Sequence, residues 1–143
     1  MRSRTGVLLI LSCFLVAIFP AQGKEPERIT VQHILIGFKN TVPDKPQKRS
    51  KQEAKALAYE LLQRAEDGED FDALVKEHTN DNFPGIMLVT NKDAPRVAGG
   101  RTRGQLVPKF GDVAFRLEVG EVGIANFNTA VCPYGWHVIK RLE

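Results

Sequence analysis

The clearest pattern in the sequence is an alternation of side chains over residues 28–38. One face of this segment carries Ile29, Val31, His33 and Leu35, and the other carries Ile34, Ile36 and Phe38. A period of two residues with many β-branched side chains is typical of a β-strand. Because both faces are largely apolar, we expect this strand to be covered on both sides.

Apolar residues at helical spacing predict three helices farther along the chain. The first begins at a capping box formed by Ser50 and Glu53 and ends at Gly68. A second, shorter helix is capped by Asp70, and a third has Pro108 in its first turn. The residues expected to face inward are Ala54, Leu57, Ala58, Leu61, Leu62, Ala65, Phe71, Leu74, Val75, Phe110, Val113, Ala114 and Leu117.

Three further strands are predicted, over residues 86–90, 122–131 and 135–142. Residues 39–49 hold two prolines and four basic residues, and we expect an exposed loop there. Residues 91–105 hold glycines, arginines and one proline without periodicity, and we expect a second loop. The order is strand, two helices, strand, helix and two strands, of which the last two can pair as a hairpin. This order predicts an α+β domain with a small mixed or antiparallel four-stranded sheet, wrapped by about three to four helices.

Residues 1–23 have the pattern of a secretory signal peptide. Two arginines precede an uncharged apolar run over residues 7–19, and Ala21 and Gly23 then supply small side chains for cleavage. We predict removal after Gly23, which leaves residues 24–143 as one domain in the periplasm or the extracellular space. The alternative is a retained membrane anchor, although the run is short for a span of about 20 residues.

Composition narrows the class of protein further. The 143 residues are 43% hydrophobic and 26% charged, the balance of a soluble globular chain. Without Arg2 and Arg4 there are 18 basic and 17 acidic residues, so the chain lacks the excess positive charge that nucleic-acid binding requires.

Removal of the signal peptide takes Cys13 with it, so the mature fold needs no disulfide. We interpret Cys132 as a semi-buried strand residue rather than a nucleophile.

Two histidines are the most informative polar residues. His33 and His137 each lie on an apolar strand face, in the first and last predicted strands. They are either separate core histidines or neighbours in adjacent strands that share a hydrogen-bond network. An unpaired buried ring would cost roughly 1–3 kcal/mol. No histidine or cysteine pair has the spacing of metal ligands, so we predict neither a metal nor a cofactor. Spacing alone goes no further than an exported α+β domain with two inward histidines.

Four segments resemble the parvulin-type (PpiC-type) peptidyl-prolyl cis-trans isomerases, or rotamases. They occur in the order of that family and extend over nearly all of residues 29–143. In chain order they are VQHILI at 31–36, DFDALVKEHTND at 70–81, RGQLVPKFGDVAFRLEVGE at 103–121 and YGWHVIK at 134–140. The resemblance implies a compact sheet wrapped by helices, with a site on its open face.

The resemblance also implies roles for individual residues. His33 and His137 match the paired histidines of the family, and Asp81 matches a position beside the isomerised bond that is cysteine in some parvulins and aspartate in others. The residues expected around the bound proline ring are Leu106, Phe110, Met87 and Tyr134. Residues 84–102 depart from the glycine-rich turn of the family, and this departure affects one wall of the pocket.

These observations predict a peptidyl-prolyl cis-trans isomerase that acts on X-Pro bonds of exported polypeptides. We expect a monomer that needs no cofactor and binds neither nucleic acid nor, after cleavage, a membrane. The alternative is a non-catalytic, peptide-binding chaperone module of the same fold, which the altered residues 84–102 favour. In some parvulins a basic loop recognises a phosphate before proline. Here we interpret the charges of Lys39, Lys45, Lys48 and Arg49 as a solvated face.

Overall fold

The computed structural model describes residues 23–143, so the predicted signal peptide lies outside the described residues except for Gly23. Nine elements follow one another within these residues. They are β1 (Arg28–Ile36), α1 (Lys51–Glu66), α2 (Phe71–His78), β2 (Ile86–Thr90), β3 (Arg101–Thr102), the 3-10 turn η1 (Arg103–Gln105), α3 (Pro108–Ala114), β4 (Val122–Ala125) and β5 (Trp136–Arg141).

The five strands form one mixed sheet in the order β3-β2-β1-β5-β4. The first strand is therefore central, with β2 and β5 antiparallel on its two sides. The last two strands pair as the expected antiparallel hairpin neighbours, and β3 pairs parallel with β2. His33 lies opposite Ile139 and Leu35 lies opposite His137, so the period of two places both histidines on the same face of neighbouring strands.

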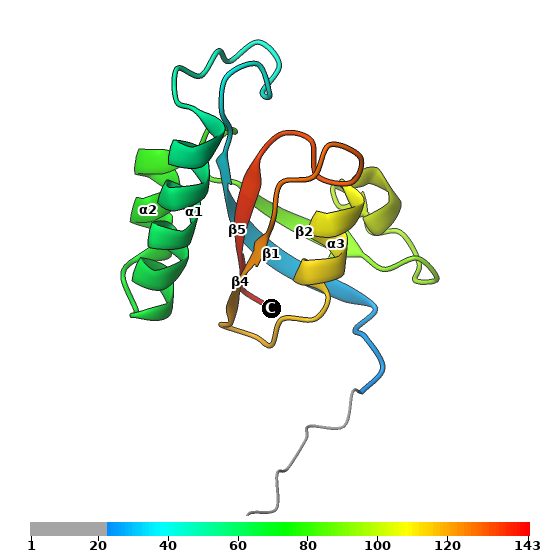
Figure 1. Cartoon of the computed structure of the whole chain (residues 1–143). Helices are drawn as coiled ribbons and strands as arrows, with labels where there is room; N and C mark the ends of the chain where they lie inside the picture. The colour runs from blue at the N-terminus through cyan, green and yellow to red at the C-terminus, as the bar shows by residue number, and fades with distance from the viewer. Residues whose placement is uncertain (1–22) are drawn as a thin grey trace, which may run out of the picture.

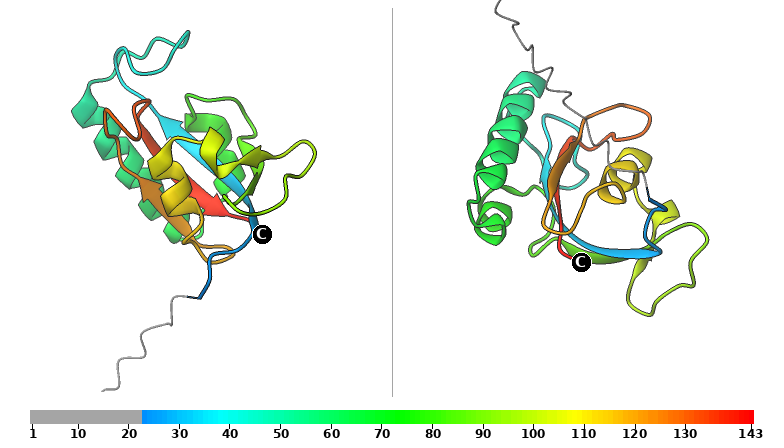
Figure 2. Two further views of the ribbon diagram at one scale, coloured as in Figure 1. Left: turned by 90° about the vertical axis from the view of Figure 1, so that its right-hand side faces the viewer. Right: turned by 90° about the horizontal axis from the view of Figure 1, so that it is seen from below.

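The two faces of the sheet pack against different helices, as Figures 1 and 2 show. On one face, Ile34, Ile36 and Val138 pack against α1 and α2. On the other face, Val31 and Ile139 pack against α3 and the chain around it. The strand β1 is thus covered on both sides, as its two apolar faces predict, and the histidines belong to the α3 side.

Local sequence signals account for the helix boundaries. Ser50 Oγ accepts from the Glu53 N–H and the Glu53 carboxylate accepts from the Ser50 N–H, which completes the predicted capping box. Asp70 caps α2 and Pro108 occupies the first turn of α3, both as predicted. The third helix, however, ends at Ala114 rather than continuing through Leu117.

The fold class is confirmed, with a fifth strand added. The extra strand, β3, has two residues and lies in the segment predicted as a loop, because two residues are too few to create an alternating pattern. The predicted strand over 122–131 stops at Ala125. Beyond it the Asn128 side chain accepts from the backbone of Ala130 and Val131, and this local turn ends the strand. Within residues 23–143 no helix has the length and apolar character to cross a membrane.

Candidate active site

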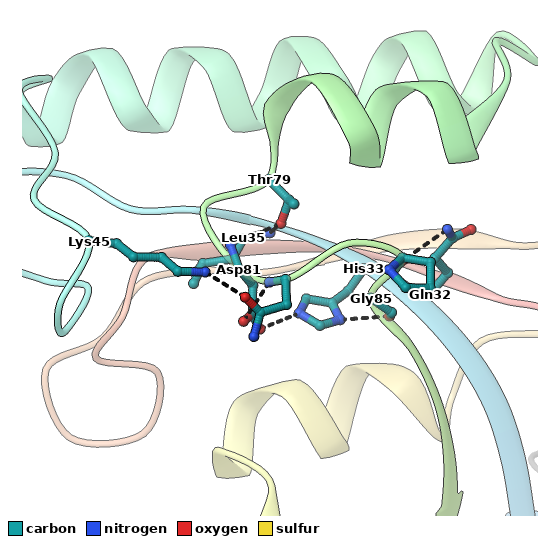
Figure 3. Close-up of polar contacts among 9 residues, drawn as sticks. Gln32, His33, Leu35, Lys45, Thr79, Asp81 and Gly85 are labelled. Atoms are coloured by element: carbon teal, nitrogen blue, oxygen red, sulfur yellow. Dashed lines mark hydrogen bonds and ion pairs between the residues drawn. The ribbon is translucent and has the colours of Figure 1, made fainter.

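His33 is a buried ring held at both nitrogens. Its side chain points from the central strand toward α3 and is only 4% exposed. The Nδ1 atom lies 3.1 Å from the carbonyl oxygen of Gly85, and the Nε2 atom lies 3.2 Å from Oδ2 of Asp81 (Figure 3). Both partners are oxygens that can only accept. A ring nitrogen that carries a proton therefore donates to the oxygen that it faces.

The turn between α2 and β2 supplies both partners of His33. Thr79 ends α2, and its hydroxyl accepts from the N–H groups of Leu35 and Asp81. The Asn80 N–H donates to the Leu35 carbonyl at 2.7 Å. These bonds fix the turn against the backbone of β1 at Leu35. Asp81 therefore reaches His33 from a half-exposed position at the rim of the site.

Gly85 is required by the same arrangement. Its φ of +67° lies in the left-handed region, and a Cβ atom there would stand 2.8 Å from the His33 carbonyl oxygen. A side chain would therefore push the turn away from the strand. Glycine allows the Gly85 carbonyl to approach the His33 ring closely enough to accept from it.

The loop before α1 is anchored to this turn. Arg49 donates to Asn80 Oδ1 at 2.7 Å and to the Gly37 carbonyl. Lys45, which points toward the turn that carries Asp81 in Figure 3, donates to Asn82 Oδ1 at 2.8 Å. The interpretation of the basic loop as a solvated face is therefore wrong for Arg49, whose hydrogen bonds are partly buried, whereas that of Lys45 is exposed to solvent. Both residues tie the loop to residues on either side of Asp81, whereas Lys39 and Lys48 are exposed.

Asp81 is the ionised group of the site. The hydrogen bond from His33 lowers the pKa of this carboxyl to about 2, although partial burial acts to raise it. The N–H of Asn82, which donates to Asp81 Oδ1 at 2.8 Å, contributes to the same lowering. Asp81 is therefore a carboxylate at neutral pH, and its charge is held beside His33 at the surface.

His137 differs sharply from His33. Its ring is 6% exposed, and neither ring nitrogen has a hydrogen-bond partner among residues 23–143. Burial lowers the pKa of His137 to about 3, and the nearby His33 lowers it as well. His137 is therefore neutral in the folded protein at neutral pH.

The two histidines are neighbours, as predicted, but no hydrogen bond joins them. Their ring centroids are 5.6 Å apart, and the nitrogens of His33 are engaged by Gly85 and Asp81 instead. The expected shared hydrogen-bond network is therefore wrong in the described part of the chain. The pair is joined by packing, since the side chains project from one face of adjacent strands.

Phe110 packs against both rings. Its centroid is 5.3 Å from that of His33 and 5.3 Å from that of His137, with interplanar angles of 89° and 90°. Such perpendicular contacts are a favoured aromatic geometry. Phe110 is 3% exposed, whereas Leu106 and Met87 pack against the same core and remain partly exposed. Phe110 is thus buried against both histidine rings, and Leu106 and Met87 belong to the same apolar cluster.

The remaining candidate, Tyr134, is 40% exposed in the loop before β5. No ring contact or hydrogen bond links it to either histidine among the described residues. Its backbone lies against Gly37, where an added Cβ would stand 3.1 Å from the Tyr134 carbonyl oxygen.

Cys132 is fully buried, more than predicted, and burial raises the pKa of its thiol to about 11.

The structure therefore brings together His33, Asp81, His137 and Phe110, with Leu106 and Met87 packed on the same side of the sheet. Sequence reasoning missed Gly85, Thr79 and the two loop residues Lys45 and Arg49. Thr79 was visible in the motif at 70–81, and a glycine after a proline marked the turn at residue 85. Neither signal showed which group its backbone or side chain would meet.

Comparison with known proteins identifies the family. Residues 18–143 match the sequence profile described as "PPIC-type PPIASE domain". This match spans most of the chain. The chain belongs to this parvulin-type domain family.

Several curated proteins are similar over most of this chain. Chaperone SurA of Chromohalobacter salexigens is 36% identical over 126 residues, which are 83% of this chain and 24% of that protein. Foldase protein PrsA 1 of Lactobacillus johnsonii is 32% identical over 133 residues, 88% of this chain and 36% of that protein. Parvulin-like PPIase of Rickettsia bellii is 32% identical over 127 residues, 84% of this chain and 34% of that protein. This chain thus spans about a quarter to a third of the length of these relatives.

A solved structure confirms the fold. The solution structure of TbPIN1 aligns with a TM-score of 0.60 at 18% identity, covering 82% of this chain and 98% of that one. At this identity the likeness concerns the fold alone. It supports the arrangement of a mixed sheet between helices, and the chemistry of the site is argued from the residues themselves.

Proposed function

We propose that this protein is a peptidyl-prolyl cis-trans isomerase that acts on X-Pro bonds of polypeptide chains. The family supports the class of activity. The observation that carries the proposal is the perpendicular packing of the Phe110 ring against the rings of His33 and His137. The Asp81 carboxylate bonds to the same His33 ring from a half-exposed position. An apolar floor bounded by a fixed polar edge suits a proline ring and the amide next to it.

The physical demands of the reaction match this site. Rotation about the prolyl bond passes through a twisted amide about 18–20 kcal/mol above the planar one. The reaction breaks no covalent bond, so it needs neither a nucleophile nor a cofactor. The twisted amide has lost resonance and is less polar than the planar one. A pocket with an apolar floor therefore binds the twisted form more tightly and lowers the barrier.

The polar residues then orient the reacting group and set the polarity around it. Asp81 and Gly85 hold the His33 ring in one orientation, and Phe110 packs against the side of that ring. His137 is neutral and buried against Phe110, so it adds no charge there. In this mechanism neither histidine transfers a proton, and Leu106 and Met87 contact the proline ring.

An isomerisation assay tests the proposal. A peptide with one X-Pro bond is cleaved by a protease that accepts only the trans isomer, and the slow phase is followed with increasing protein. We expect the rate of that phase to rise in proportion to the protein concentration. No acceleration by a folded preparation, verified by circular dichroism, would contradict the proposal.

The relatives favour a second function. Two of them are named a chaperone and a foldase, and residues 84–102 depart from the family pattern. A non-catalytic domain would bind extended polypeptides at the same apolar surface without accelerating isomerisation. Suppression of aggregation of an unfolded test protein, measured beside the isomerisation assay, separates the two. Suppression without catalysis would favour the chaperone module.

We further propose that the protein acts outside the cytoplasm as a monomer. The support is the signal-like sequence of residues 1–23, with its apolar run and small-residue cleavage site. The substrates are then exported chains that contain proline. Fractionation of the producing cells tests the location, and gel filtration of the purified protein tests the oligomeric state.

A further inference from the structure

Arg103 is a largely buried arginine whose side chain contacts three other parts of the chain. Its side chain is 11% exposed. The guanidinium donates to Glu25 before β1, to Asn91 after β2 at 3.1 Å and to Asp112 in α3 at 2.9 Å. It also stacks over the Phe115 ring, 4.9 Å from the centroid. A planar group with five donors is suited to such a multiple contact.

The segment before β1 is held down by these contacts. Besides the ion pair of Glu25 with Arg103, the Asn91 side chain donates to the Pro26 carbonyl and the Asn91 N–H donates to the Glu27 carbonyl. The segment before β1, the loop after β2 and Arg103 together line a cavity of about 410 Å³. None of the seven predicted site residues lines this cavity.

Arg103 is also connected to the apolar residues of the proposed active site. Its backbone carbonyl accepts from the Leu106 N–H, and its aliphatic stem packs on Gly111, where an added Cβ would stand 3.1 Å from Arg103 Cγ. Gly111 and Asp112 directly follow Phe110 in α3. The arginine thus holds the helix that carries Phe110 on two successive residues and holds the turn before it at Leu106.

We propose that Arg103 is a positioning residue for isomerisation and that Glu25 holds the Arg103 guanidinium in place. The segment before β1 then sets the placement of α3, and therefore of Phe110 and Leu106. This inference rests on the proposed function, because it assigns these distant residues a role in the same site. The charge state supports it, since the hydrogen bond from Arg103 lowers the pKa of Glu25 despite the opposing effect of burial.

Glu25→Gln is the mildest test, because it removes the charge and keeps the shape. Glu27→Gln is the matched control, since the Glu27 carboxylate is exposed in the same segment and has no side-chain hydrogen bond or ion pair within residues 23–143. We expect Glu25→Gln to lower kcat/KM about three- to tenfold through misplacement of the pocket, and Glu27→Gln to leave it unchanged. Arg103→Lys keeps the charge but cannot span the three acceptors, and we expect an equal or larger loss.

A second readout separates positioning from loss of stability. The Phe110 ring stands perpendicular to both histidine rings, so the ring-proton chemical shifts of His33 and His137 report its placement. We expect these shifts to change in Glu25→Gln while the circular dichroism spectrum stays that of the wild type. Glu25→Gln and Glu27→Gln that agree in kcat/KM and in the histidine shifts would overturn the proposal. Activity lost without a change in those shifts would also overturn it.

The two proposals fail in different ways. If the wild-type protein shows no isomerisation, the proposed function is wrong and the role of Arg103 in catalysis fails with it, even if the histidine shifts in Glu25→Gln show that Glu25 influences the placement of Phe110. If the wild type is active and Glu25→Gln matches Glu27→Gln in both measurements, only the positioning role is wrong.

Discussion

The Nε2 atom of His33 lies 3.2 Å from Oδ2 of Asp81, which joins a buried ring on the central strand to a half-exposed carboxylate on the turn before β2. The same ring contacts Phe110 on the side of α3. A single side chain thus connects the polar rim of the proposed site to its apolar floor. Changes at the rim, at the floor and at the second histidine should therefore have different effects.

Phe110 should matter more for catalysis than for folding. Phe110→Leu keeps an apolar side chain but loses the perpendicular contacts to both histidines, so we expect kcat/KM to fall at least about tenfold, or about 1.4 kcal/mol of transition-state stabilisation. The expected loss in unfolding free energy is about 1–2 kcal/mol. Phe110→Ala would remove about 3–5 kcal/mol and is the less selective test.

Phe71→Leu is the matched control for this change. Phe71 is also 3% exposed, but it belongs to α2 and to the apolar cluster on the opposite face of the sheet. It should lose similar stability, measured by urea unfolding, and retain its activity. Full activity in folded Phe110→Leu would show that the floor is assigned to the wrong residue.

Asp81 should contribute stability that disappears in acid. Its folded-state pKa of about 2 lies below the ordinary value of 3.8, so its contribution is complete above the ordinary value and is lost as the pH falls through the folded one. Asp81→Asn should therefore be less stable than the wild type at neutral pH, and the difference should shrink between about pH 4 and pH 2.

Urea unfolding at several pH values measures this difference. Asp93→Asn, a change at an exposed carboxylate in the loop after β2, provides the control and should leave the acid dependence unaltered. A gap between wild type and Asp81→Asn that stays constant with pH would show that the His33 contact does not stabilise the carboxylate.

His137 should make the folding stability depend on pH in a higher range than Asp81 does. Its folded pKa of about 3 lies below the ordinary value of 6.5, so the unfolded chain binds a proton in this interval and the folded chain does not. Stability should therefore decrease as the pH falls from about 6.5 to 3. His137→Leu removes this slope.

At neutral pH the same variant should be nearly as stable as the wild type. Replacing a buried ring without hydrogen bonds by an apolar side chain is expected to change stability by less than about 1.5 kcal/mol. Thermal unfolding across the pH range measures both effects. An unchanged slope in His137→Leu would mean that His137 is protonated in the folded protein.

The sequence carried most of the fold and part of the site. Alternation in β1 and β5 was enough to place His33 and His137 on one face, and helical spacing together with Pro108 located the helix that carries Phe110. The hydrogen-bond partners could not be derived in the same way. The carbonyl of Gly85 reaches His33 only because the turn adopts a positive φ, and this depends on contacts with a strand about fifty residues earlier in the chain.

Long-range contacts also explain what the basic residues do. Lys45, Arg49 and Arg103 look like surface charges in a linear sequence, since each lies in a segment without periodicity. Their roles are set by acceptors that are distant in the chain, namely Asn82, Asn80 and Glu25. No local pattern predicts such pairs, because they form only when the sheet brings separate turns together.

Processing of the N-terminus gives a prediction that is independent of the site. The apolar run and the small residues Ala21 and Gly23 predict cleavage before Lys24. Mass spectrometry of the exported protein should therefore give a mature N-terminus at Lys24, two residues before Pro26. An exported protein that retains Met1 would contradict the signal peptide and favour the membrane anchor.

The most direct test of catalysis is exchange spectroscopy on a peptide with one X-Pro bond at equilibrium. Uncatalysed exchange between the cis and trans isomers takes tens to hundreds of seconds, too slow for cross-peaks on the usual mixing time of about one second. With substoichiometric wild-type protein we predict cis–trans cross-peaks whose build-up rate is proportional to protein concentration and falls at least about tenfold in Phe110→Leu. Peptide signals that shift on binding while the exchange rate stays at its uncatalysed value would contradict the account.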